Sequence, residues 1–199
     1  MTTTTDQGAL FDTAPVQNPA PAGATSDATA PAQAAEARPE RDTIVITVYG
    51  QPAPQGSKRN VGNGVMIEMS KRVKPWRADV KAAALEVVEA TPQRPALLDG
   101  PLAASIVFTM REQPASRPSW WPKGVRWSKA LRWRPASTPD LSKLLRATED
   151  ALTGVIWTDD ARVVEYTRLA KYYAGHPATD VLDRPGAVIR VWPLTETVL

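Results

Sequence analysis

Three carboxylates flank one short amphipathic segment of the chain, and they are the side chains best suited to chemistry. Asp140 stands directly before the segment, and Asp159 and Asp160 follow it. Carboxylate oxygens are ligands that Mg²⁺ prefers, and the ion keeps several waters that phosphate oxygens can replace. A bound ion of this kind can activate water and stabilise a leaving oxygen. Together with a basic, tryptophan-rich segment immediately upstream, these carboxylates suggest a metal-dependent enzyme that acts on phosphodiesters.

The spacing permits these carboxylates to share one ion. A helix of about 12 residues spans about 18 Å, and about six extended residues span about 20 Å, so the chain can return to Asp140. Other interpretations stay open, because Asp140 is also an ordinary N-cap residue and Asp159-Asp160 also suits a solvated turn. Glu149 and Asp150 are interpreted as surface positions or as partners of nearby bases.

A basic, tryptophan-rich segment lies immediately upstream. Residues 111–134 carry a net charge of +6 and include Trp120, Trp121, Trp127 and Trp133. Basic side chains attract the phosphate backbone, and indoles stack on unpaired nucleobases. The tryptophans equally suit packing of a long loop onto the domain, or a dimer interface. The candidate DNA-contacting residues of this segment are Lys123, Arg126, Trp127, Lys129, Arg132 and Arg134.

Composition excludes several kinds of chemistry. The chain has no cysteine, and His176 is its one histidine, which excludes thiolate chemistry and argues against histidine-based triads and multi-histidine zinc sites. We find no apolar run of membrane-spanning length and no secretory leader pattern. We therefore expect a cytoplasmic protein with no membrane partner.

The charges divide the chain into two parts. Residues 1–42 are rich in Ala, Pro and Thr and carry a net charge of −4, which predicts a disordered acidic tail. The remaining residues, 43–199, carry a net charge of +7 and are expected to form one domain. A basic domain favours a polyanionic partner.

Hydrophobic periodicity and Pro/Gly breaks predict the elements of that domain. Residues 50–59 are expected to form a loop and residues 111–139 a long linker. The predicted strands cover residues 43–49, 102–110, 163–173 and 187–192, with a hairpin-type turn and short strand within 61–69, and the predicted helices cover residues 75–90 and 141–153.

Three segments resemble the RusA family of Holliday-junction resolvases, which is common in phages and prophages. They are residues 46–59, residues 139–154 with their Pro-Asp-Leu start, and Trp-Thr-Asp-Asp-Ala-Arg-Val-Val at 157–164. The resemblance implies an α/β (α+β) domain with a small mixed β-sheet packed with two main helices. It also implies a homodimer that binds four-way DNA junctions and nicks two strands with Mg²⁺, for which Mn²⁺ is a possible substitute.

The family pattern also implies site residues. Its acidic helix opens Asp-x-Asp, with a base six positions after the first Asp, which assigns catalytic roles to Asp140 and Arg146. The further catalytic Asp falls on Asp160, with Asp159 beside it as a metal ligand. The basic loop after the first strand assigns phosphate contacts to Lys58 and Arg59.

The second Asp of the pattern falls on Ser142. Its hydroxyl can ligate Mg²⁺ or hold a metal-bound water, but it brings no charge. Two hypotheses follow: a structure-selective endonuclease of DNA recombination and repair, or a structure-selective DNA-binding protein whose cleavage is weakened or lost. A scaffold protein whose basic loop binds protein or RNA is a third.

Overall fold

A computed structural model describes residues 42–56, 58–60, 66–68, 71–91, 97–128 and 130–194. For residues 58–60 and 66–68 it describes the backbone only. The tail predicted for residues 1–42 lies outside these ranges except for its last residue, so its disorder stays a prediction.

A mixed sheet of four strands forms the centre of the domain, with the order β1-β6-β4-β5. β4 pairs antiparallel with β6 and parallel with β5, so Ile106 of β4 stands between Ile189 and Leu169. Because β4 is a central strand, all nine of its residues are buried. This arrangement confirms the predicted fold class. The strands are β1 (Ile44–Tyr49), β4 (Leu102–Met110), β5 (Val163–Tyr173) and β6 (Gly186–Pro193).

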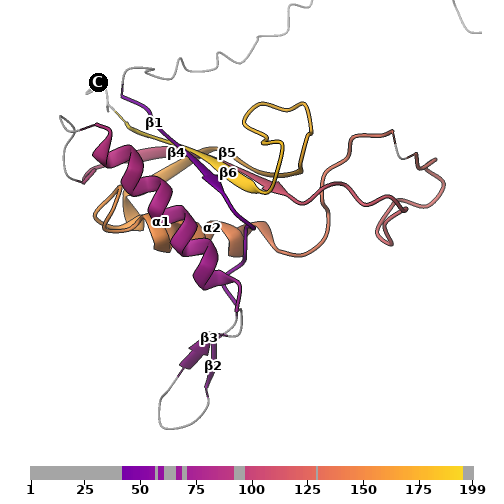
Figure 1. Ribbon diagram of the computed structural model, residues 1–199, viewed down its shortest axis with the longest axis horizontal. Coiled ribbons are helices and arrows are strands. Elements are labelled where there is room, and N and C mark those ends of the chain that lie inside the picture. Colours follow the sequence, from indigo (N-terminus) through magenta and orange to yellow (C-terminus); the bar gives the residue numbers. More distant parts are fainter. Residues whose placement is uncertain are drawn as a thin grey trace, which may run out of the picture. The chain divides into compact units, whose positions relative to one another are not determined.

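Two helices, α1 (Val73–Glu89) and α2 (Leu141–Leu152), pack against each other and cover one side of the sheet (Figure 1). Trp76, Val80 and Ala84 recur at helical spacing on α1 and are fully buried. The α1 helix begins two residues before the predicted start, so Pro75 lies in its first turn, where a missing N–H costs nothing. α2 presents Leu144, Thr148 and Leu152 to the same core.

A separate two-stranded sheet precedes α1. Its strands are β2 (Lys58–Asn60) and β3 (Met66–Glu68), which pair antiparallel with Lys58 opposite Glu68. The interpretation of residues 58–59 as flexible loop is therefore wrong, because their backbone groups pair with β3. The predicted Gly62-Asn63-Gly64 turn lies outside the described residues.

The linker from β4 to α2 has no helix or strand in its described part, residues 111–128 and 130–139, as predicted. In Figure 1 it extends away from the sheet. The turn predicted at 159–162 is a short 3₁₀ helix, η1 (Asp160–Arg162), which leads directly into β5. The linker and η1 thus lie on either side of α2 in the chain and set the positions of the predicted site residues.

Candidate functional site

Asp140 occupies the N-cap position of α2, but its side chain does not cap the helix. The carboxylate instead lies 3.0 Å from the Lys143 amino group, and each side chain is 53% exposed. An exposed pair of this kind contributes little stability. The interpretation of Asp140 as a capping residue is therefore not supported, because its carboxylate does not cap the helix. The carboxylate oxygens remain accessible to a ligand.

Lys171 of β5 fixes the backbone just before Asp140. Its Nζ donates to the carbonyl oxygens of Ser137 at 2.6 Å and Pro139 at 2.7 Å. Burial lowers the pKa of Lys171, and the nearby negative charge of Asp140 opposes that shift. Sequence reasoning missed this residue, because a lysine 31 positions away on a strand belongs to no local motif.

Asp159 and Asp160 have different surroundings. Asp159 Oδ1 accepts a hydrogen bond from the Ala161 N–H at 2.8 Å and so caps η1. Asp160 lies near the C-terminal half of α2, where its charge acts on Glu149 and Tyr166. The turn interpretation therefore holds for Asp159, while no hydrogen bond or ion pair engages the Asp160 carboxylate among the described residues.

Glu149 is the acidic residue that Asp160 approaches. The Tyr166 hydroxyl donates to Glu149 Oε1 at 2.6 Å. Burial raises the pKa of Glu149, and the charges of Asp160 and Asp150 raise it further. Burial also raises the pKa of Tyr166. Glu149 is therefore half-buried between α2 and β5 rather than a plain surface position, whereas Asp150 pairs with Arg77 of α1, as the sequence suggested.

Asp99 anchors the turn that carries Asp159 and Asp160. Its Oδ1 accepts from Thr158 Oγ1 at 3.0 Å and from Arg162 Nε at 2.6 Å. These hydrogen bonds, followed by the charge of Arg162, lower the pKa of Asp99. The backbone of Leu98 pairs with Ile156 and Thr158 beside it. No sequence signal identified Asp99, since it lies 59 residues from Thr158.

The solvent face of α2 carries the remaining predicted residues. Ser142, Arg146 and Glu149 recur at helical spacing, so they share this face, and Ser142 and Arg146 are exposed. Glu149 follows Asp140 by nine residues, or about 14 Å along the axis at about 1.5 Å per residue. The returning chain therefore brings Asp160 beside Glu149, not beside Asp140.

A Mg²⁺ ion suits part of this donor set. Among the described residues, no three or more Asp, Glu or His side chains are grouped to hold a metal. Mg²⁺ needs only one or two carboxylates and fills its other positions with water and substrate phosphate. Asp140 and Asp160 are each exposed and could each supply one such carboxylate, but Asp160 lies beside Glu149, so the site that the sequence predicted, with Asp140, Asp159 and Asp160 around one ion, is not assembled within the described chain. The roles of Asp140, Ser142, Asp159 and Asp160 as ligands stay predictions.

Packing accounts for three of the four linker tryptophans. The ring centroid of Trp133 lies 5.1 Å from that of Trp120, 5.8 Å from that of Trp121 and 4.9 Å from that of Tyr173. Trp133 is 7% exposed. These four residues, here called the tryptophan cluster, attach the linker to the end of β5. Trp127, the tryptophan chosen as a DNA contact, is half-buried.

Most of the linker's bases remain at the surface. Lys123, Arg126 and Arg132 are exposed, and the Arg134 guanidinium lies 4.7 Å from the Tyr172 ring centroid. Lys129 and the side chains of Lys58 and Arg59 lie outside the described part of the chain. No helix within the described ranges is long and apolar enough to cross a membrane.

Comparisons with known proteins place these features in one family. The model of the family described as endodeoxyribonuclease RusA matches residues 49–182, which include both acidic motifs and the linker. YqaN, an uncharacterized protein of Bacillus subtilis (strain 168), is 27% identical over 143 residues, which cover 72% of this chain and 96% of that protein. The family acts on branched DNA such as Holliday junctions. The chain therefore belongs to the RusA family of structure-selective endodeoxyribonucleases.

Proposed function

We propose that this protein is a Mg²⁺-dependent endonuclease that resolves four-way DNA junctions in recombination and repair, in the cytoplasm of a bacterial or phage-infected cell. The observation that carries the proposal is Asp140, whose accessible carboxylate caps nothing although it begins a helix. The family match over both acidic motifs supports the same conclusion. Mn²⁺ is a possible substitute.

Asp140 and Asp160 would each supply a single carboxylate to a Mg²⁺ ion, because Asp160 lies beside Glu149 and not beside Asp140, and Asp159 would position Asp160 by capping η1. When bound, Mg²⁺ supplies charge stabilisation and an activated water. Arg146, exposed on the solvent face of α2, would contact the phosphate group under attack, and Lys58 and Arg59 would contact phosphates of the bound DNA. The lysine and arginine side chains of the linker would hold the arms of the junction.

A homodimer suits this substrate. A four-way junction has approximate two-fold symmetry, and a two-fold dimer presents two equal sites to two equivalent strands. Paired nicking follows when both sites cut before the protein dissociates.

The proposal is tested with an end-labelled four-way junction in Mg²⁺. We expect Asp140→Asn and Asp160→Asn each to lower the rate of nicking on the order of 100-fold or more, because each removes charge from the reaction centre. Junction binding should persist in both variants, since neither removes a positively charged side chain. Asp183→Asn is the matched control, because Asp183 is an exposed carboxylate on the β5–β6 loop. Wild-type nicking by Asp160→Asn would remove that residue from the site.

Ser142 favours a second candidate function, that of a junction-binding protein without cleavage. The residue leaves the solvent face of α2 one negative charge short of the family pattern. This candidate predicts salt-dependent junction binding with no nicking in Mg²⁺ or Mn²⁺. Cleavage at stoichiometric protein in either metal would eliminate it.

A further inference from the structure

Two adjoining hollows lie beside Asp140 and together form a groove that no motif describes. Their volumes are about 380 Å³ and about 330 Å³. The groove lies between the turn after β1, the end of β4 and the segment before α2. Both hollows are lined by Gln51, Arg72, Met110, Thr138 and Pro139. Because Asp140 follows Pro139 directly, the groove adjoins the proposed reaction centre.

The groove is positively charged. Arg72, Arg111 and Lys171 line it, against the single acid Glu112. Arg72 and Arg111 are exposed, and neither forms an ion pair with a described residue. The Lys171 amino group is held by carbonyl oxygens and lies near the negative charge of Asp140, so Arg72 and Arg111 are the cations of the groove without an ion pair among the described residues. Uncompensated cations in a concave surface favour an anion.

Arg111 is also pre-oriented. Its Nε donates to Gln51 Oε1 at 2.8 Å, which holds the guanidinium against the groove and leaves its terminal N–H groups for another acceptor. Guanidinium groups match the geometry of phosphate oxygens and can donate two parallel hydrogen bonds. A phosphate group is therefore the anion that suits Arg111 best.

We propose that this groove binds the sugar–phosphate backbone of the DNA strand that runs past Asp140, with Arg72 and Arg111 contacting its phosphates. The two hollows in series suit a chain of phosphates rather than one small anion. Lys171 lies at the side of Asp140 and keeps the groove wall in place. The assignment rests on the proposed function, because it places the strand next to the site that cuts it.

The test measures binding of a labelled four-way junction, and of a linear duplex of equal length, from about 50 to 200 mM salt in chelator. In the double variant Arg72→Gln/Arg111→Gln we expect weaker binding and a slope of log affinity against log salt that is smaller by about 1.8, or about 0.9 for each phosphate contact. Both DNA forms should be affected alike, because each presents the same sugar–phosphate backbone to the groove.

Two matched variants control this experiment. Lys81→Gln/Arg184→Gln removes two exposed charges outside the groove and should keep the wild-type slope. Arg72→Lys/Arg111→Lys keeps the positive charges and should also keep the wild-type slope. Circular dichroism confirms that all three variants are folded.

The outcomes separate the groove from the function. If the wild-type protein binds and nicks junctions and the Arg72→Gln/Arg111→Gln variant keeps the wild-type salt slope, the groove assignment is overturned and the proposed function stands. An equal loss in the Lys81/Arg184 variant overturns the groove assignment too, because the effect is then one of net charge. A wild-type protein that binds neither DNA form overturns both the groove and the proposed function.

Discussion

At the scale of single residues, Ser142 is the position at which the proposed metal site departs from the acidic pattern that the family resemblance implies. It is exposed on the first turn of α2, one residue from Lys143 and one turn from Arg146. Lys143 and Arg146 are positively charged, and Ser142 stands where the family pattern has an Asp. This end of the helix is therefore less negative than the family pattern would make it. Restoring the acid therefore tests whether the rest of the site is intact.

We predict that Ser142→Asp lowers the Mg²⁺ concentration needed for half-maximal nicking and raises the rate of nicking. The added carboxylate supplies a further oxygen ligand, and its pairing with Arg146 stabilises α2 by only about 0.3–0.5 kcal/mol. Ser142→Asn adds bulk without charge and should leave the Mg²⁺ requirement unchanged. Equal Mg²⁺ titrations of the two variants would contradict the prediction.

Local spacing together with the family resemblance singles out Asp140 and Asp160, whose roles stay predictions. No local pattern identifies the residues that support them. The hydrogen bond from Tyr166 to Glu149 and the anchoring of the turn by Asp99 join residues 17 and 63 positions apart. Such pairs depend on how α2 and β5 pack, which local spacing does not encode.

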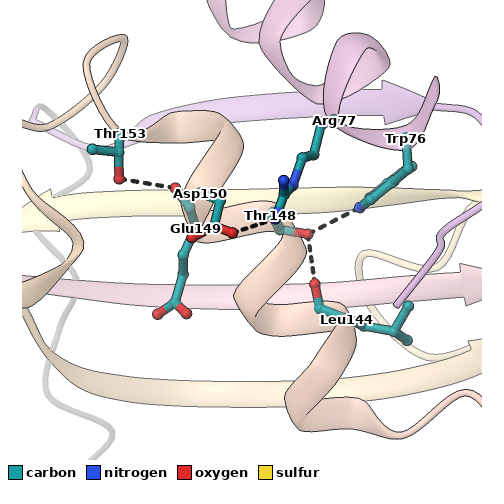
Figure 2. A network of polar contacts seen from close by, with 7 residues as sticks. All are labelled: Trp76, Arg77, Leu144, Thr148, Glu149, Asp150 and Thr153. Carbon is teal, nitrogen blue, oxygen red and sulfur yellow. Dashed lines mark hydrogen bonds and ion pairs between the residues drawn. The ribbon is translucent and has the colours of Figure 1, made fainter. Parts of the chain in front are cut away.

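At the scale of elements, a buried hydrogen bond ties the two helices together. Figure 2 shows the Trp76 indole N–H directed at Thr148 Oγ1, at 3.1 Å, while the same hydroxyl donates to the Leu144 carbonyl at 3.0 Å. Both Trp76 and Thr148 are fully buried. The Glu149 side chain points to the other side of α2, away from α1 (Figure 2). Adjacent residues of α2 thus point to opposite sides of the helix, Thr148 to the core and Glu149 away from α1.

We predict that Thr148→Val lowers the free energy of unfolding by about 1–3 kcal/mol, because it leaves the buried Trp76 N–H without an acceptor. Thr148→Ser keeps the hydroxyl and loses one methyl, at a smaller cost of about 0.8 kcal/mol. Urea unfolding followed by circular dichroism measures both. A Val variant as stable as wild type would show that this hydrogen bond contributes nothing to the helix contact.

The elements themselves were predictable because their periodicity is strong. β5 has the predicted bounds, and α2 ends one residue earlier than predicted. β2 was missed because a three-residue strand carries no period. The position of β6 between β1 and β4 was not predictable, since the last strand of the chain enters the middle of the sheet. Strand order depends on long-range pairing, which no local pattern records.

At the scale of the whole molecule, the tryptophan cluster attaches the basic linker to the domain. The cluster brings together residues from both halves of the linker and from the end of β5. It therefore limits how far Lys123 and Arg126 can move, and it presents these bases on a firmly attached loop.

We predict that Trp133→Ala speeds tryptic cleavage at Lys123 and Arg126 at least about tenfold, because removing a buried Trp costs about 3–5 kcal/mol and proteolysis follows the population of the opened loop. Trp127→Ala, which changes a half-buried ring outside the cluster, should have a much smaller effect. Timed digestion read by mass spectrometry compares them. Equal cleavage rates would show that the cluster does not restrain the linker.

The place of the linker within the β4–α2–β5 crossover has an evolutionary consequence. Its ends join β4, which pairs with β5 and β6 in the sheet, and α2, which packs against α1. Lengthening a loop costs little, about 0.6 kcal/mol for each doubling. Insertions and deletions here can therefore change the length of the basic linker while Asp140 and Asp160, the proposed metal ligands, keep their places. If the linker holds the DNA as proposed, this architecture lets substrate range diversify independently of catalysis.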